Sequence, residues 1–171
     1  MTVNWGDGSE PITVSGTGNV NAAAHTYASG GDYVVTMTVA TGCALKLGNG
    51  TESTGILGTT ALTQNMYRTV LKAVEVGSGV DTLRSYCFQR CSSLEKIMIS
   101  PDVTTVGTST FAGLYELGSL HFYGTTPPSI SNSQFGNTPV WCKIYVPAGY
   151  LTTYQNKTNY PSKTTYTYVE E

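Results

Sequence analysis

Four side chains that could contact a ligand recur along the chain at intervals of 23, 23 and 24 residues: Glu75, Met98, His121 and Tyr145. A carboxylate, a thioether, an imidazole and a phenol in one line can bind by charge, hydrogen bonding and packing, a mixture typical of recognition surfaces. A flanking line holds Ala73, Lys96, Ser119 and Lys143. The four residues of the first line, with Lys96 and Lys143, are the candidate ligand-binding residues.

Groupings that perform catalysis are not evident in the sequence. There is no Ser-His-Asp arrangement, close carboxylate pair or phosphate-binding loop. His25 and His121 lie 96 positions apart, which is not the spacing of metal ligands. Asp7 in its Gly-Asp-Gly turn is one carboxylate where a hard cation needs six or more oxygens, so an Asx turn is the favoured role. The sequence predicts a protein that is not an enzyme and uses no metal or cofactor.

The four cysteines also lack metal-binding spacing. Cys87 and Cys91 fall inside the repeat, and the next repeat has Leu114 at the position of Cys91. This indicates buried thiols that serve as small apolar side chains. Cys43 and Cys142 have no cysteine neighbour in the sequence. We expect four free thiols.

The elements that position the candidate residues are the coils of a repeat. Apolar residues recur with the same period in four sets: Leu71, Leu94 and Leu117; Val74, Ile97, Leu120 and Ile144; Val76, Ile99, Phe122 and Val146; Phe88, Phe111 and Phe135. Such a period predicts a solenoid, in which each coil stacks on the next. Each coil begins with a short strand that points two residues inward, and a second inward strip follows at Val103 and Val106. Side chains between the inward residues then point outward in rows across the coils.

The bulk composition agrees with a β-rich domain and excludes two partner classes. Charged residues make up 12% of the chain, the net charge is −2 and no basic cluster occurs, so nucleic acid is not an expected partner. No apolar run reaches the roughly 20 residues that span a bilayer, so membrane insertion is not expected. The start of the sequence lacks the features of a signal peptide, which leaves export as part of a longer secreted protein or by another route.

The first 42 residues predict β hairpins, with turns at Asp7-Gly8 and Gly30-Gly31 and a half-buried strand over 33–39. The segments NWGDGSE from Asn4 and HTYASGGDYVVTMTV from His25 resemble the core of a PKD-type immunoglobulin-like domain. The resemblance is partial, because a full domain has two further strands before the tryptophan. We expect a reduced β unit that caps the open end of the solenoid.

The repeats resemble the BspA-like leucine-rich repeat of bacterial surface proteins. Residues 83–107, LRSYCFQRCSSLEKIMISPDVTTVG, fit the pattern of that family nearly throughout, and residues 142–154 are similar to its C-terminal coil with a short helix. The resemblance implies a mainly β, right-handed leucine-rich-repeat solenoid with coils of 23–24 residues. The expected order is a PKD-like cap over 1–42, an irregular first coil over 43–70, repeats and a C-terminal cap over 71–160, and a frayed tail over 161–171.

The resemblance also implies a function: an extracellular, non-catalytic adhesion module at the cell surface that binds a protein or glycan of a host or neighbouring cell. The expected face is the outward side of the sheet, with the candidate residues named above. An alternative is a receptor-binding or structural part of a prophage tail or fibre, since the sequence opens at Met1 without the features of a signal peptide and is expected to carry a short β cap.

Overall fold

The computed structural model describes residues 1–15, 25–40, 45–47, 70–131 and 135–171, with only the backbone of residues 45–47. The chain divides into two compact units, Met1–Ala44 and Leu45–Glu171, and each is described by itself. The predicted irregular first coil over 43–70 lies outside the described residues except for the strand β4 (Leu45–Leu47) and residue 70, and Cys43 lies outside them entirely.

The first unit contains a small antiparallel sheet. Its strands are β1 (Thr2–Asn4), β2 (Ile12–Thr13) and β3 (Thr36–Thr38), in the order β2-β1-β3. The expected half-buried strand is wrong in its burial, because all three residues of β3 are exposed. Among the described residues of this unit only Val3 is a buried apolar side chain, so these residues provide no core that would bury one side of β3.

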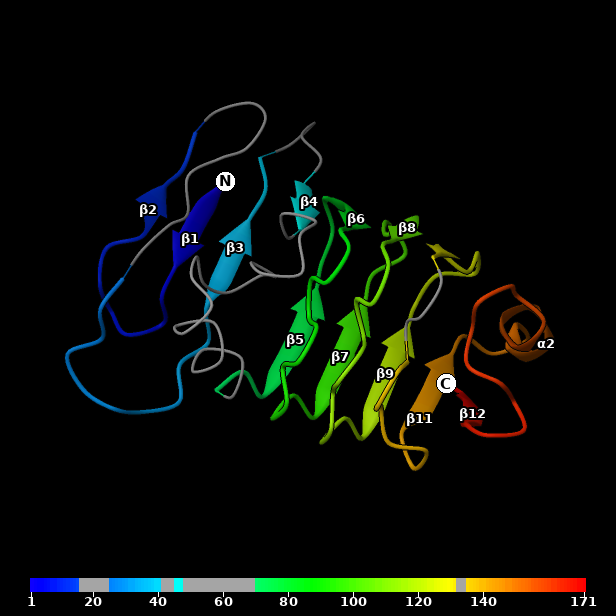
Figure 1. Cartoon of the computed structure of the whole chain (residues 1–171). Helices are drawn as coiled ribbons and strands as arrows, with labels where there is room; N and C mark the ends of the chain where they lie inside the picture. Colours follow the sequence, from blue (N-terminus) through cyan, green and yellow to red (C-terminus); the bar gives the residue numbers. More distant parts are fainter. Residues whose placement is uncertain (16–24, 41–44, 48–69, 132–134) are drawn as a thin grey trace. The chain divides into compact units, whose positions relative to one another are not determined.

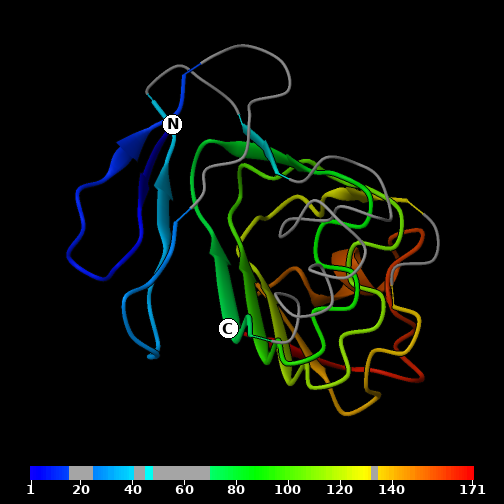
Figure 2. The same cartoon turned by 60° about the vertical axis from the view of Figure 1, so that its left-hand side comes forward.

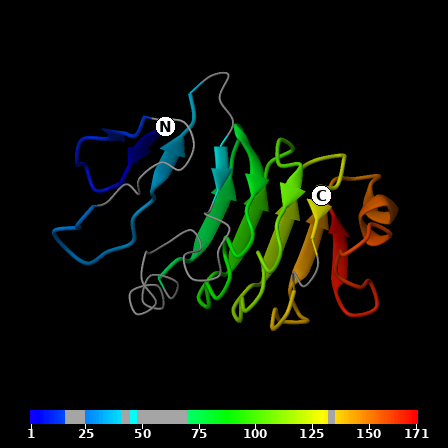
Figure 3. The same ribbon diagram turned by 45° about the horizontal axis from the view of Figure 1, so that its top comes forward.

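The second unit is the predicted solenoid. Its main sheet has five parallel strands in the order β12-β11-β9-β7-β5 (Figure 1). They are β5 (Ala73–Val76), β7 (Lys96–Ile99), β9 (Ser119–Phe122), β11 (Lys143–Val146) and β12 (Thr167–Glu170). The predicted inward neighbours are confirmed, since register partners run from Val74 to Ile97, Leu120 and Ile144. Figure 3 shows these strands side by side in chain order.

A second parallel sheet forms another side of the same coils (Figure 2). It contains β10 (Ser129–Ile130), β8 (Thr105–Val106), β6 (Val80–Leu83) and β4, in that order. Val103 and Val106, the predicted second strip, are 2% and 0% exposed. The core lies between the two sheets and holds the apolar residues of every coil, among them Phe88, Phe111 and Phe122.

The return segment of each coil repeats at the level of single backbone angles. Tyr86 and Ser109, 23 positions apart, both have positive φ (63° and 53°). Positive φ also recurs at Arg90, Gly113 and Asn137, which are 23 and 24 positions apart. These segments join coil to coil by backbone hydrogen bonds, such as the one that Tyr86 N donates to Thr108 O at 2.8 Å, and their described residues form no further strand in this unit. The described return segments are therefore irregular and not helical.

The C-terminal residues close the solenoid. The predicted helix is α2 (Leu151–Gln155). Tyrosine hydroxyls in this helix and in the segment after it donate to backbone carbonyls: Tyr154 to Gly124 (2.7 Å), Tyr160 to Pro128 (2.9 Å) and Tyr166 to Thr138 (3.1 Å). The expectation of a frayed tail over 161–171 is wrong. Residues Thr167–Glu170 form β12, because their side chains continue the packing of β11 and their backbone completes its ladder.

Candidate functional site

The outward side chains of the five-stranded sheet lie in straight rows across the coils. Glu75 pairs with Met98, Met98 with His121, and His121 with Tyr145, so four predicted site residues are register neighbours. The row continues into β12 at Val169. We call these five residues the outer row. Their adjacency is confirmed, and their role in binding stays a prediction.

Exposure varies strongly along the outer row. Glu75 is exposed and Met98 and Tyr145 are half-buried, whereas His121 is only 8% exposed. The expectation that His121 lies open on an exposed line is therefore wrong. Two neighbours cover its ring, one from the next coil and one from the end of the chain.

His121 is held between a ring and a carboxylate. The Tyr145 ring lies parallel to the imidazole, with centroids 4.2 Å apart and an interplanar angle of 3°. Nδ1 of His121 lies 2.8 Å from Oε1 of Glu171. A stacked, hydrogen-bonded imidazole has little rotamer freedom, so His121 is a fixed part of the face.

Sequence reasoning missed two residues of this face, Tyr123 and Glu171. Backbone hydrogen bonds extend the sheet by one row: Tyr123 N donates to Ile99 O, and Glu171 N to Val146 O, each at 3.0 Å. Tyr123 is 45% exposed, with its ring centroid 6.3 Å from that of His121. Partial burial raises the pKa of Tyr123, and the negative charges of Glu171 and Glu75 raise it further. The alternation after His121 was the available signal for Tyr123.

The two candidate lysines lie in the row on the other side of the outer row. Lys96 and Lys143 both pair with Ser119 in register, at the start of their strands. Among the described residues neither lysine forms an ion pair, and neither does Glu75. The face is therefore polarised along the strands, with ammonium groups at the strand starts and carboxylates towards the strand ends.

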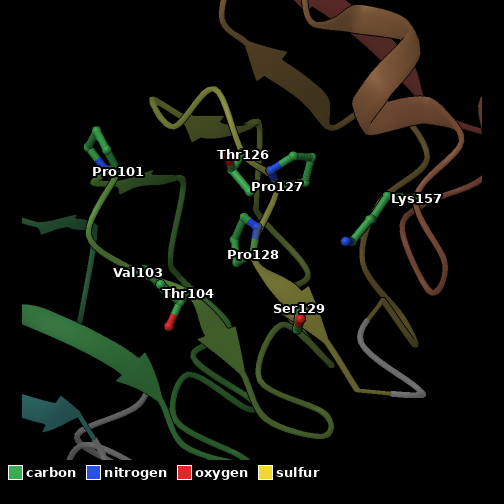
Figure 4. Close-up of a pocket in the computed structure, with 8 residues that line it drawn as sticks. All are labelled: Pro101, Val103, Thr104, Thr126, Pro127, Pro128, Ser129 and Lys157. Carbon is green, nitrogen blue, oxygen red and sulfur yellow. The ribbon is translucent and has the colours of Figure 1, made fainter.

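A shallow pocket of about 250 Å³ lies elsewhere in this unit (Figure 4). Three prolines, Pro101, Pro127 and Pro128, form its walls, and Lys157 lies across from them. Its lining contains no predicted site residue. Its volume is also below the roughly 300 Å³ at which small-molecule sites begin. The pocket is therefore separate from the candidate face and is not proposed as a ligand site.

The motif residues of the first unit pack into one another. The rings of Trp5, His25, Tyr27 and Tyr33 follow in a ladder, with successive centroids 5.0, 4.8 and 4.1 Å apart. Asp7 contacts the second ring of this series, because its Oδ2 lies 2.7 Å from His25 Nε2. The predicted Asx turn is confirmed, since Ser9 N donates to Asp7 Oδ1 at 3.1 Å.

The hydrogen bonds of Asp7 make its titration a test of this turn. The Ser9 hydroxyl first, and then His25, lower the pKa of Asp7 from 3.8 to about 2. A carboxyl whose pKa is lower in the folded state than in the unfolded chain stabilises the fold at pH values above its unfolded pKa. This contribution is lost as the pH falls towards 2. We expect the Asp7 carboxyl carbon to titrate near pH 2 in NMR spectra of the full chain. Ser9→Ala should raise the midpoint and Ser29→Ala should not; a wild-type midpoint near 3.8 would contradict the turn.

The remaining groups of chemical interest are arranged for packing. Cys87, Cys91 and Cys142 are buried. Burial raises the pKa of the Cys142 thiol to about 12 and that of Cys87 well above its usual value, so neither is a ready nucleophile. Within the described residues no three His, Cys, Asp or Glu side chains gather into a metal site. The described helix is also too short to cross a bilayer.

Comparison with known proteins agrees with the repeat architecture. A family model described as BspA type Leucine rich repeat region matches residues 57–164 in six copies. No curated protein and no solved structure matches the chain. The match does not reach the first unit, so the PKD-type resemblance stays a prediction. Because the family model covers well over half of the chain and the coils stack as its repeats require, the chain belongs to the BspA-type leucine-rich repeat family.

Proposed function

We propose that the chain is a non-catalytic adhesion module of a bacterial surface protein, and that it binds a partner protein with the outward face of its five-stranded sheet. One observation carries the proposal: this face presents unpaired charges and half-exposed rings on a rigid scaffold. Glu75, Lys96 and Lys143 have no internal ion pair among the described residues, while Tyr123 is 45% exposed. Exposed aromatic and charged side chains on a fixed backbone are what binding hot spots use.

The dimensions of the face set the kind of binding. Five parallel strands about 4.8 Å apart give a face about 20 Å wide. That width accommodates one extended segment of a partner, which is smaller than a standard protein interface. A single module should therefore bind weakly, and adhesion would depend on many modules acting together. Cell-surface display supplies such copies, which agrees with an extracellular location.

A surface substitution tests the proposal without disturbing the core. In the face variant, Glu75→Ala, Tyr123→Ser and Lys143→Ala are combined, because all three side chains are exposed. Beads coated with the wild-type chain should adhere to an immobilised basement-membrane extract, and the face variant should lose at least about tenfold in adhesion. Loss of even two moderate contacts of about 1 kcal/mol each accounts for such a factor, and many copies enlarge it.

The matched control changes the same residue types elsewhere in the unit. It combines Glu116→Ala, Tyr115→Ser and Lys163→Ala, which are also exposed and lie outside the outer row and its flanking rows. We expect the control to adhere as the wild type does, and both variants to unfold within a few degrees of it. Equal adhesion of all three chains, or equal loss in both variants, would contradict the proposed face.

A further inference from the structure

The last strand of the main sheet has one edge whose backbone groups lack partners. β12 stands at the end of the strand order (Figure 3). On its inner side, Glu171 N donates to Val146 O at 3.0 Å and Glu171 O accepts from Ala148 N at 3.1 Å. Because backbone groups alternate along a strand, Tyr168 and Glu170 direct their N–H and C=O groups away from β11. Within the described parts of the chain, these outward groups form no hydrogen bond.

The corresponding edge of the second sheet is covered. Ile130 in β10, the last strand of that sheet, accepts at its carbonyl from Asn159 Nδ2 at 2.8 Å. The Tyr160 hydroxyl donates to the carbonyl of Pro128, just before β10, at 2.9 Å. At β12, by contrast, donors and acceptors alternate along an open edge, and an added β-strand is the partner that satisfies both. The chemistry of this edge therefore specifies an extended strand as its occupant.

The charges of the sheet face favour an antiparallel strand from a second copy of the chain. Lys96 and Lys143 lie at the starts of their strands, whereas Glu171 follows the end of β12. About a two-fold axis, the start of each β12 lies beside the end of the other, so the lysine end of one face adjoins the carboxylate end of its copy. Head-to-tail addition of a copy would be parallel and would keep like ends side by side.

The sequence of β12 selects the register of such a pair. With Val169 at the axis, Tyr168 of each copy lies opposite Glu170 of the other, and each pair exchanges both backbone hydrogen bonds. An axis at Glu170 would place two carboxylates directly opposite each other, which is destabilising. An axis at Tyr168 would require the N–H of Tyr166, which already donates to Ser162 O at 2.9 Å. Only the axis at Val169 uses all the open groups without opposing like charges.

We propose that two copies of this chain pair through β12, antiparallel about a two-fold axis at Val169, and join their five-stranded sheets into one. The inference goes beyond the proposed function, because it concerns the edge of the sheet and not its face. The half-buried Val169 side chains of the two copies then pack against each other. A pair of such short strands is a small interface, so the dimer is weak and forms where copies are concentrated. It doubles the available face, which adds to multivalent binding.

A cysteine cross-link tests the register. Val169→Cys places two thiols at the axis, where opposed residues have Cα atoms about 4.5 Å apart, within the range of a disulfide. Thr167→Cys is the control, because the two Thr167 positions lie at least about 13 Å apart along the strands. Both variants carry Cys43→Ser, and the cysteines of the described coils are buried. With oxidised glutathione as the oxidant, Val169→Cys should give at least about fivefold more cross-linked dimer on a non-reducing gel.

A proline at the edge tests the backbone hydrogen bonds. Glu170→Pro removes an outward N–H and leaves the ladder to β11 intact, since proline is tolerated where the N–H faces solvent. Glu170→Ala is the matched control, because it removes the same carboxylate, with its bond to Gly149 N, and keeps the N–H. In sedimentation equilibrium over rising concentrations of the full chain, wild type and Glu170→Ala should associate alike. Glu170→Pro should raise the dissociation constant at least about tenfold.

The outcomes separate this inference from the proposed function. Equal cross-linking by the two cysteine variants, unchanged association of Glu170→Pro, or a wild-type chain that stays monomeric throughout would overturn the dimer. A head-to-tail contact would also leave the two introduced thiols apart and give no excess cross-link. None of these results affects the adhesion test, because the face variant leaves β12 unchanged and a single face can bind without a second copy.

Discussion

Phe111→Ala should lower the free energy of unfolding by about 3–5 kcal/mol, measured by chemical denaturation of the full chain. Phe111 is 0% exposed and its ring stacks on Phe135 of the next coil, with centroids 5.5 Å apart. Removing a buried phenyl ring costs the transfer energy of the ring and leaves a cavity. A solenoid is a poor place to repair such a cavity, because the backbone of each coil is held by hydrogen bonds to the coils on both sides.

The control for this experiment is Glu75→Ala. Glu75 belongs to the same unit but its side chain is exposed, so its removal should change the stability by less than about 0.5 kcal/mol. Phe111→Leu should fall between the two, because leucine refills part of the volume. Equal losses from Phe111→Ala and Glu75→Ala would mean that inward and outward rows are assigned the wrong way round.

The period of the sequence was sufficient to predict the stacking of the coils. Val74, Ile97, Leu120 and Ile144 are register neighbours because a parallel stack is the arrangement that buries every recurring apolar residue against its own counterpart. The same argument placed Phe111 against Phe135, although one extra residue separates those coils. Period and residue type therefore determine this part of the fold.

The last strand was missed although its signal is present. Tyr168 lies 24 positions after Ile144 and Glu170 lies 24 after Val146, and these are register partners in the structure. A tyrosine and a glutamate stand where the earlier coils have Val, Ile, Leu or Phe, so the apolar pattern ends before the structural repeat does. At the edge of the stack an inward position is only partly covered, which allows Tyr168 to be half-buried and Glu170 to accept from Gly149 N at 2.8 Å.

The sequence was sufficient to predict that the candidate residues lie in one row, but not which of them are exposed. Alternation along a strand places His121 on the outward side, but alternation contains no information on what covers an outward residue. The cover comes from Tyr145, one coil away, and from Glu171, which is 50 positions along the chain. The contact between His121 and Glu171 depends on the path of the final segment of the chain, and the repeat pattern of the sequence does not predict that path. The first unit has the same character, since Asp7 contacts His25, which lies 18 positions along the chain.

Gly107→Ala should be among the most damaging single-methyl additions to the second unit. A Cβ on Gly107 would lie 2.2 Å from the backbone nitrogen of Ser85 and 2.7 Å from its Cα, in the preceding coil. The neighbouring atoms are backbone and cannot rotate away. The two coils would have to separate at this point, where Gly107 N donates to Leu83 O at 2.7 Å and Tyr86 N donates to Thr108 O at 2.8 Å. We expect a loss of about 3 kcal/mol or more, at the upper end of overpacking effects.

Gly77→Ala is the matched control, because a Cβ at that position meets no atom within 4 Å. Replacing glycine with alanine also reduces the conformational entropy of the unfolded chain, so Gly77→Ala should be neutral or stabilise by up to about 1 kcal/mol. In thermal unfolding of a chain of this size, 3 kcal/mol corresponds to a midpoint lowered by about 6–12 °C. A Gly107→Ala midpoint within 2 °C of the wild type would show that the coils are not in backbone contact at this glycine. Because the close approach of Gly107 and Ser85 sets the spacing between two coils, such a result would also remove the basis for treating the sheet face as a rigid surface.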